Sequence, residues 1–136
     1  MVFVASGTGF APIKALLEHL SFTGSSRAVT VYWGGRRPSD LYLHDWMVAT
    51  AAAMPNVTYV PVVSDAEAAD QWTGRTGFVH QAVLDDFADL SGIEAYVCGA
   101  PIVVESAQRD FVAQRGLPAD AFFADSFTRA ADKATA

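Results

Sequence analysis

A glycine-rich turn separates an apolar run from a helical pattern within the first residues of the chain. Residues 2–5 are apolar, Gly7-Thr8-Gly9 follows, and apolar residues after Pro12 recur with the spacing of one helix face. Such a turn points backbone N–H groups at a phosphate, and its glycines let the ligand approach the backbone. Pro12 stands where a dinucleotide fingerprint has its third glycine, which disfavours an ordinary dehydrogenase. The alternative is a tight turn without a ligand.

A second turn repeats this arrangement near residue 100, where Gly99 and Pro101 follow the apolar run that ends at Cys98. In a doubly wound sheet, the strands before these two turns are neighbours at the switch point, where ligands bind. Two glycine–proline turns facing one crevice are a more specific signal than either alone. We therefore expect Cys98 at a ligand site, although a free cysteine is more often a small buried hydrophobic residue.

Two other segments carry polar residues that could contact the same ligand. Gly34 leaves room after an apolar run, and Arg36 could bind a phosphate or form a surface pair with Asp40. Residues 64–77 lack helix or strand periodicity, and a loop of that length in a small domain is more often functional than a flexible connection.

Composition excludes several classes of protein. The formal net charge of −6, with no basic cluster beyond Arg36-Arg37, argues against a nucleic-acid partner. No apolar run approaches the roughly 20 residues that cross a bilayer, so no membrane partner is expected. The histidines lie far apart and the chain has one cysteine, so neither a metal site nor a disulfide is expected. No secretory signal is visible, and the cysteine count predicts a reducing, cytoplasmic compartment.

These residues must be positioned by a single α/β domain. The 136 residues are 51% hydrophobic, enough for one buried core. Apolar runs alternate with helical patterns, which predicts a doubly wound parallel five-stranded sheet of order 3-2-1-4-5 with helices on both faces. Strands are expected over 2–5, 28–33, 57–63, 95–98 and 121–124, and helices over 12–22, 40–54, 78–87 and 101–115. The domain is expected to span 1–128, with a frayed tail over 129–136.

Taken together, the motifs resemble the pyridine-nucleotide domain of the ferredoxin–NADP reductase family. The resemblance rests on G-T-G-x-x-P at 7–12, W-G-x-R-x-x-x-D-L-Y at 33–42, V-C-G-x-P at 97–101 and an acid-x-aromatic ending at 125–127. Residues 72–77 and 122–125 are most similar to NADH-dependent reductases of bacterial multicomponent systems, including the CDP-6-deoxy-glucoseen reductase type.

The resemblance implies a function and a role for each motif. NADH would deliver a hydride to FAD, and electrons would then pass singly to an iron–sulfur centre. By resemblance, the residues at the pyrophosphate are Gly7, Thr8 and Gly9. Those on the nicotinamide side are Cys98, Gly99 and Pro101. Asp125 stands where the family often has glutamate, and Phe127 stands where a terminal aromatic covers the flavin, although Phe127 could also be a packing residue.

Relatives that use NADPH place Ser-Arg where this chain has Ser64-Asp65. A carboxylate repels the 2′-phosphate of NADPH, which favours NADH. Arg36 and Arg75 could still reach that phosphate.

The family's FAD-binding barrel and any iron–sulfur cysteine cluster are missing from this sequence, so we expect a nucleotide domain that lacks bound FAD and is inactive alone. The leading hypothesis is the NADH-binding half of a flavoprotein reductase. The alternative is a stand-alone nucleotide-binding or regulatory module without redox turnover. A flavodoxin-like signalling receiver is disfavoured, because the first apolar run lacks the acidic cluster that a receiver needs.

Overall fold

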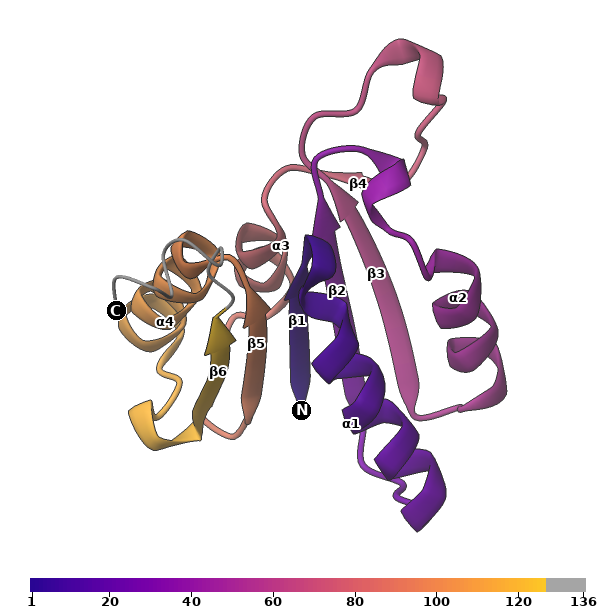
Figure 1. Cartoon of the computed structure of the whole chain (residues 1–136). Coiled ribbons are helices and arrows are strands. Elements are labelled where there is room, and N and C mark those ends of the chain that lie inside the picture. The colour runs from indigo at the N-terminus through magenta and orange to yellow at the C-terminus, as the bar shows by residue number, and fades with distance from the viewer. Residues whose placement is uncertain (127–136) are drawn as a thin grey trace, which may run out of the picture.

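The computed structural model describes residues 1–126, which form a parallel sheet between two layers of helices (Figure 1). Its six strands lie in the order β4-β3-β2-β1-β5-β6. They are β1 (Val2–Ser6), β2 (Val29–Gly35), β3 (Val57–Val63), β4 (Arg75–Thr76), β5 (Ala95–Gly99) and β6 (Phe122–Ser126). The helices are α1 (Phe10–Thr23), α2 (His44–Ala53), α3 (Val79–Asp86) and α4 (Pro101–Arg115).

The predicted α/β architecture and the order of its five strands are confirmed, but the predicted strand count is wrong by one. The additional strand, β4, pairs in parallel with the end of β3, where Arg75 lies opposite Val62 and Thr76 opposite Val63. This strand lies inside the segment 64–77, which the sequence predicts to be a loop. Two residues are too few to show the alternation by which a strand is recognised.

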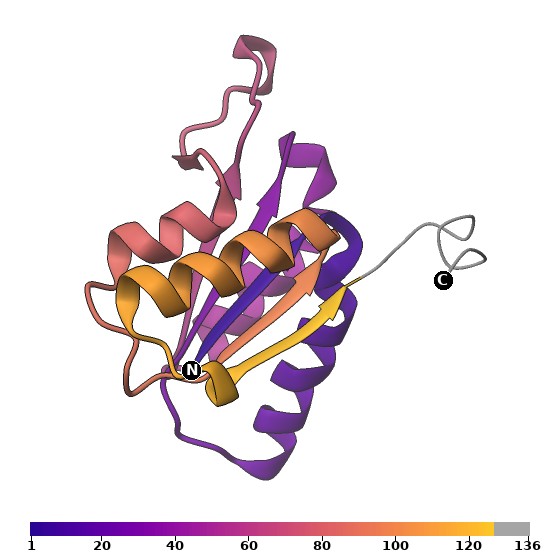
Figure 2. The same ribbon diagram turned by 90° about the vertical axis from the view of Figure 1, so that its left-hand side faces the viewer.

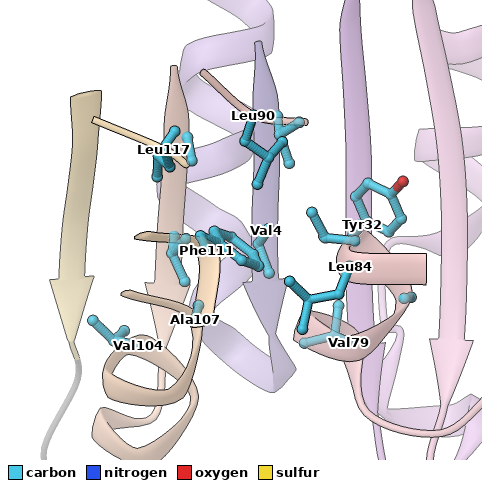
Figure 3. Packing of buried hydrophobic residues seen from close by; sticks show 14 of the residues in the cluster. Val4, Tyr32, Val79, Leu84, Leu90, Val104, Ala107, Phe111 and Leu117 are labelled. Atoms are coloured by element: carbon cyan, nitrogen blue, oxygen red, sulfur yellow. The ribbon is translucent and has the colours of Figure 1, made fainter. Parts of the chain in front are cut away.

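Alternate residues of β1 supply the two hydrophobic cores on either side of the sheet. Val2 and Val4 face α3 and α4, whereas Phe3 and Ala5 face α1 and α2. All four residues are buried, because helices cover both faces of a parallel sheet. Figure 2 shows α3 and α4 side by side on one face. In Figure 3 the labelled side chains of these two helices and of the strands form one continuous cluster.

Helix boundaries differ from the expected ones mainly before α2. The expected helix over 40–54 begins at His44 instead, because Pro38–Asp40 forms a separate 3-10 turn, η2. The Asp40 carboxylate accepts hydrogen bonds from the N–H groups of Arg36 and Arg37, each at 3.0 Å, and this holds the turn. The α4 helix begins at Pro101 and ends before Gly116, as its sequence predicts.

Some expectations concern residues beyond 126. Phe127 and the expected tail over 129–136 lie outside the described residues.

Within residues 1–126, no helix is both long enough and apolar enough to span a bilayer. The same part of the chain contains no group of three or more histidine, cysteine or acidic side chains arranged to hold a metal ion.

Candidate functional site

A cleft opens at the carboxyl ends of β1, β2 and β3, between the first turns of α3 and α4. Its volume is about 590 Å³. A smaller pocket of about 250 Å³ adjoins it and shares the residues Ser6, Gly7 and Ala100. The residues that line the cleft or the pocket include the predicted Gly7, Thr8, Gly34, Arg36, Ser64 and Gly99. The crevice expected from the two glycine turns is therefore present.

Gly7 presents an open stretch of backbone to this cleft. Its φ is +52°, and within residues 1–126 only its chain neighbours come within 4 Å of a Cβ atom placed there. Its carbonyl oxygen accepts a hydrogen bond of 2.9 Å from the indole N–H of Trp33. Trp33 stacks on Phe10, with ring centroids 3.9 Å apart. The buried Trp33 thus holds the turn in place while leaving its outer side free for a ligand.

Gly9 has a different role, because the turn packs against β5 at this position. A Cβ atom on Gly9 would lie 2.7 Å from the Cα of Gly99. Gly99 has a φ of +147°, and a Cβ atom there would collide with the hydroxyl of Ser6. That hydroxyl accepts a hydrogen bond of 3.1 Å from the N–H of Ala100. Gly9 and Gly99 therefore allow the close backbone contact that forms the crevice.

Helices begin around the cleft without side-chain caps. In the described part of the chain, no side chain forms a capping hydrogen bond at the start of α1, α3 or α4. The residues before them are Gly9, Phe78 and Ala100, and none has a side chain that could accept a bond from an N–H group. Helix N-termini carry partial positive charge. Their first-turn N–H groups thus favour an anionic ligand in the cleft.

One end of the cleft is lined by the polar side chains of Arg36, Asp40 and Ser64. Asp65 lies beside them, with a carboxylate oxygen 3.4 Å from the guanidinium of Arg36. Both side chains of this pair are exposed, by 81% and 69%, so the interaction leaves Arg36 available to a ligand. Asp40 bonds to the backbone N–H of Arg36.

Gly34 serves packing at the floor of the cleft. A Cβ atom there would lie 2.6 Å from the Cβ of Val79, so the glycine lets the first turn of α3 approach β2.

Several predicted residues line neither the cleft nor the smaller pocket, and two of them are Pro12 and Arg75. Pro12 lies in the first turn of α1, and Arg75 forms an ion pair of 2.9 Å with Asp86 in α3. Asp86 also accepts a hydrogen bond of 2.7 Å from the hydroxyl of Tyr32. The Arg75 guanidinium lowers the pKa of Asp86, whereas burial raises the pKa of Tyr32. Arg75 therefore connects β4 to α3.

Pro101 is the first residue of α4 and lies between Ala100 and Ile102, which both line the cleft.

Cys98 is buried beneath α1, and Asp125 lies opposite it in the register of β5 and β6. Burial raises the pKa of the Cys98 thiol to about 11, and the negative charge of Asp125 adds to the shift. The thiol is therefore protonated at neutral pH, which suits a packing role and not that of a nucleophile. Asp125 is exposed at the edge of the sheet.

Sequence reasoning missed the apolar side walls of the cleft. Phe78 precedes α3 and Ile102 lies in the first turn of α4, and their exposed fractions are 69% and 68%. His80, Val103 and Ser106 also line these walls. A large apolar residue at the start of an expected helix, as at Phe78 in the helix expected over 78–87, is the sequence signal that could have found this wall.

This chain is similar to known proteins along almost its whole length. The sequence profile of the oxidoreductase NAD-binding domain matches residues 3–109. Protein RfbI of Salmonella typhimurium is 39% identical over 131 residues, which are 94% of this chain and 38% of that protein. The CDP-6-deoxy-L-threo-D-glycero-4-hexulose-3-dehydrase reductase of Yersinia pestis is 43% identical over 130 residues, 93% of this chain and 37% of that protein.

Solved structures show the same fold. The crystal structure of the Amycolatopsis cytochrome P450 reductase GcoB superimposes with a TM-score of 0.83 at 31% identity. The match covers 95% of this chain and 38% of that one. The chain therefore spans less than two fifths of the length of these relatives.

Proposed function

Because the chain belongs to the oxidoreductase NAD-binding domain family, we propose that its cleft binds NADH and orients the nicotinamide toward a flavin. The flavin would be FAD on a separate barrel domain, and electrons would leave it for an iron–sulfur centre. The Yersinia pestis relative is a dehydrase reductase, and an Acinetobacter pittii relative is a phenol hydroxylase P5 protein, which supports a role in electron supply.

The open backbone of Gly7 is the observation that carries this proposal. It lies where the cleft and the smaller pocket meet, next to Ala100 at the start of α4. A pyrophosphate is a compact dianion that needs several N–H donors and little side-chain bulk around it. Uncapped helix starts and a glycine with no neighbour over its Cβ position meet both needs.

The two ends of the site fit the two halves of the dinucleotide. Phe78 and Ile102 offer exposed apolar surface to a flat adenine ring, and Ser64 and Asp65 offer acceptors to a ribose hydroxyl. The small pocket beside Gly99 would receive the nicotinamide, next to the strand end that carries Cys98. This assignment uses the whole length of the cleft.

In this proposal the chain acts by positioning. When bound, reduced nicotinamide supplies the hydride that a flavin accepts. The backbone around Gly7 fixes the pyrophosphate, and Gly99 lets β5 pack closely on Ser6 beside the nicotinamide end. Cys98 stays protonated and buried, so it contributes shape and water exclusion without exchanging a proton. Holding the reacting ring in one orientation is the part of catalysis that such residues can supply.

A charge placed at the turn tests the proposal. Thr8 is exposed and directly follows Gly7 in the turn, so Thr8→Asp puts a carboxylate beside the proposed pyrophosphate. We expect NADH affinity, measured by titration calorimetry, to fall at least about tenfold. Thr58→Asp is the control, because Thr58 is exposed near the amino end of β3, at the opposite end of the sheet. Equal affinity in both variants, or no NADH binding by the unmodified chain, would overturn the proposal.

A further inference from the structure

The turn after β2 and the segment after β3 lie together at the polar end of the cleft. Figure 1 shows both rising beyond the carboxyl end of the sheet. We call residues 64–71 the rim lobe. Residues 64–69 and 71 are exposed, and only Asp70 is partly buried. Because this lobe has almost no apolar contacts of its own, polar contacts must determine its conformation.

Arg37 supplies three of these contacts with one side chain. Its guanidinium donates two parallel hydrogen bonds to the carboxylate of Asp70, at 2.8 Å and 2.7 Å. A third contact of 3.1 Å reaches the carboxylate of Glu67. Asp70 is only 18% exposed, and the same carboxylate accepts the N–H of Glu67 at 2.9 Å. A bidentate arginine–carboxylate pair of this kind is directional as well as charged.

The other end of this connection is also held. Asp40 accepts the backbone N–H of Arg37, so the arginine extends from a fixed point. The N–H of Ser64 donates to the carbonyl of Gly35, and the N–H of Asp65 donates to that of Arg36, each at 2.9 Å. The beginning of the rim lobe is therefore joined to the β2 turn by backbone bonds. Its far end is joined by the side chain of Arg37.

From this geometry we infer that Arg37 is a positioning residue that holds the rim lobe where Ser64 and Asp65 meet the ribose end of a bound nucleotide. The inference rests on the proposed NADH-binding function. Arg36 is the arginine that lies in the cleft, and Arg37 acts on the ligand only through the rim lobe.

The pair persists over the ordinary pH range, because the guanidinium lowers the pKa of Asp70 and so keeps that carboxylate charged. Without Arg37 the lobe samples other conformations. The apparent affinity for the nucleotide then falls by the fraction of molecules that remain competent to bind.

The test compares four variants of the 136-residue chain. Arg37→Gln keeps a polar, unbranched side chain but shortens it and removes the charge and the bidentate geometry, and Arg37→Lys keeps the charge. Asp70→Asn keeps an acceptor for the N–H of Glu67 but removes the ion pair. Arg27→Gln is the matched control, because Arg27 forms an ion pair of 2.7 Å with Glu94 and neither residue lines the cleft.

The readouts are titration calorimetry with NADH, hydrogen exchange of the backbone, and the unfolding midpoint. In Arg37→Gln and Asp70→Asn we expect NADH affinity to fall about fivefold. Faster exchange should be confined to residues 65–71, and the unfolding midpoint should match that of Arg27→Gln. Arg37→Lys should recover part of the affinity, a rescue that general destabilisation would not give.

NADH binding by the unmodified chain distinguishes the positioning role of Arg37 from the proposed binding function. If the unmodified chain binds NADH but Arg37→Gln binds it equally well, the positioning role is wrong and the binding proposal stands. The same conclusion follows if exchange in the rim lobe does not change. If the unmodified chain binds no NADH, both proposals fall together.

Discussion

A Cβ atom on Gly9 would lie 2.5 Å from the carbonyl oxygen of Cys98. The two glycines of the first turn therefore have different structural roles. Gly9 lets the turn pack on the backbone of β5, and Gly7 leaves the backbone open toward the cleft. A substitution at Gly9 should thus change the stability of the fold, and only one at the open side of the turn should report directly on ligand binding.

The first prediction concerns Gly9. Gly9→Ala should lower the free energy of unfolding by about 2–3 kcal/mol, because the added methyl group meets backbone that cannot rotate away. The measurement is chemical denaturation followed by circular dichroism. Gly92→Ala is the control, since within the described residues a Cβ atom at Gly92 would enter open space. We expect that control to change stability by no more than about 0.5 kcal/mol. Equal effects of the two substitutions would contradict the close contact with β5.

The second prediction concerns the choice of nucleotide. The carboxylate of Asp65 lies 3.4 Å from the guanidinium of Arg36. Asp65→Ser should remove a charge that repels the 2′-phosphate of NADPH and leave Arg36 free to bind it. NADPH affinity should then rise about tenfold. NADH affinity should fall slightly, because a neutral hydroxyl replaces the charged carboxylate as the acceptor for the ribose hydroxyl.

Calorimetry with both nucleotides measures this change in preference. Asp120→Ser makes the same change of charge before β6, at the amino end of the sheet, and should leave the NADH to NADPH ratio unchanged. Tighter binding of NADPH than of NADH by the unmodified chain would contradict the role given to Asp65. So would an Asp65→Ser variant with the original preference.

The third prediction concerns the reactivity of Cys98. Its thiol has a pKa of about 11, and it is the chain's one cysteine, so alkylation reports on this site alone. At pH 8 only about 0.1% of such a thiol is ionised, against roughly a quarter for an ordinary cysteine. Iodoacetamide should therefore modify the folded chain at least about 100-fold more slowly than the chain in urea. Similar rates in the two states would show an accessible, ordinary thiol.

The same pKa shift makes a fourth prediction, on stability at high pH. In the unfolded chain the thiol ionises near pH 8.5, whereas in the folded chain it ionises at about pH 11. Between these values the unfolded state binds fewer protons, so this group makes stability fall as pH rises. Below pH 8 the contribution is constant. Denaturation of the chain and of Cys98→Ser at several pH values isolates it, because only the unmodified chain should show this part of the decline.

The fifth prediction concerns the flavin. The purified 136-residue chain should be colourless and should not oxidise NADH with ferricyanide. Stacking of a flavin ring on a single aromatic side chain would stabilise the bound flavin by about 1 kcal/mol. A chain that retains its flavin at micromolar concentration needs a binding free energy of about 8 kcal/mol. A visible spectrum and a steady-state assay test this expectation. A yellow protein that turns over without added flavin would contradict the proposed division between a nucleotide domain and a flavin domain.

Local sequence was enough to predict five of the six strands and the glycine turns that follow three of them. The apolar run over residues 2–5 indicates a strand that is buried on both faces, and its residues do alternate between the two cores. Glycines at the carboxyl ends of β1, β2 and β5 indicate where the strands end and the backbone must turn or be approached closely. These features depend on residues close together in the chain, and the structure confirms the order of the five predicted strands.

Tertiary structure alone decided which partner each polar side chain has. Arg75 pairs with Asp86 and leaves the cleft, whereas Arg37 reaches Asp70, 33 residues further along the chain. Nothing in the spacing of these residues distinguishes Arg36, which lines the cleft, from its neighbour Arg37. A charged side chain can pair with any opposite charge within reach, and only the folded backbone determines which one that is. For the same reason, the contact of Gly9 with Cys98 exists only once β1 and β5 lie side by side.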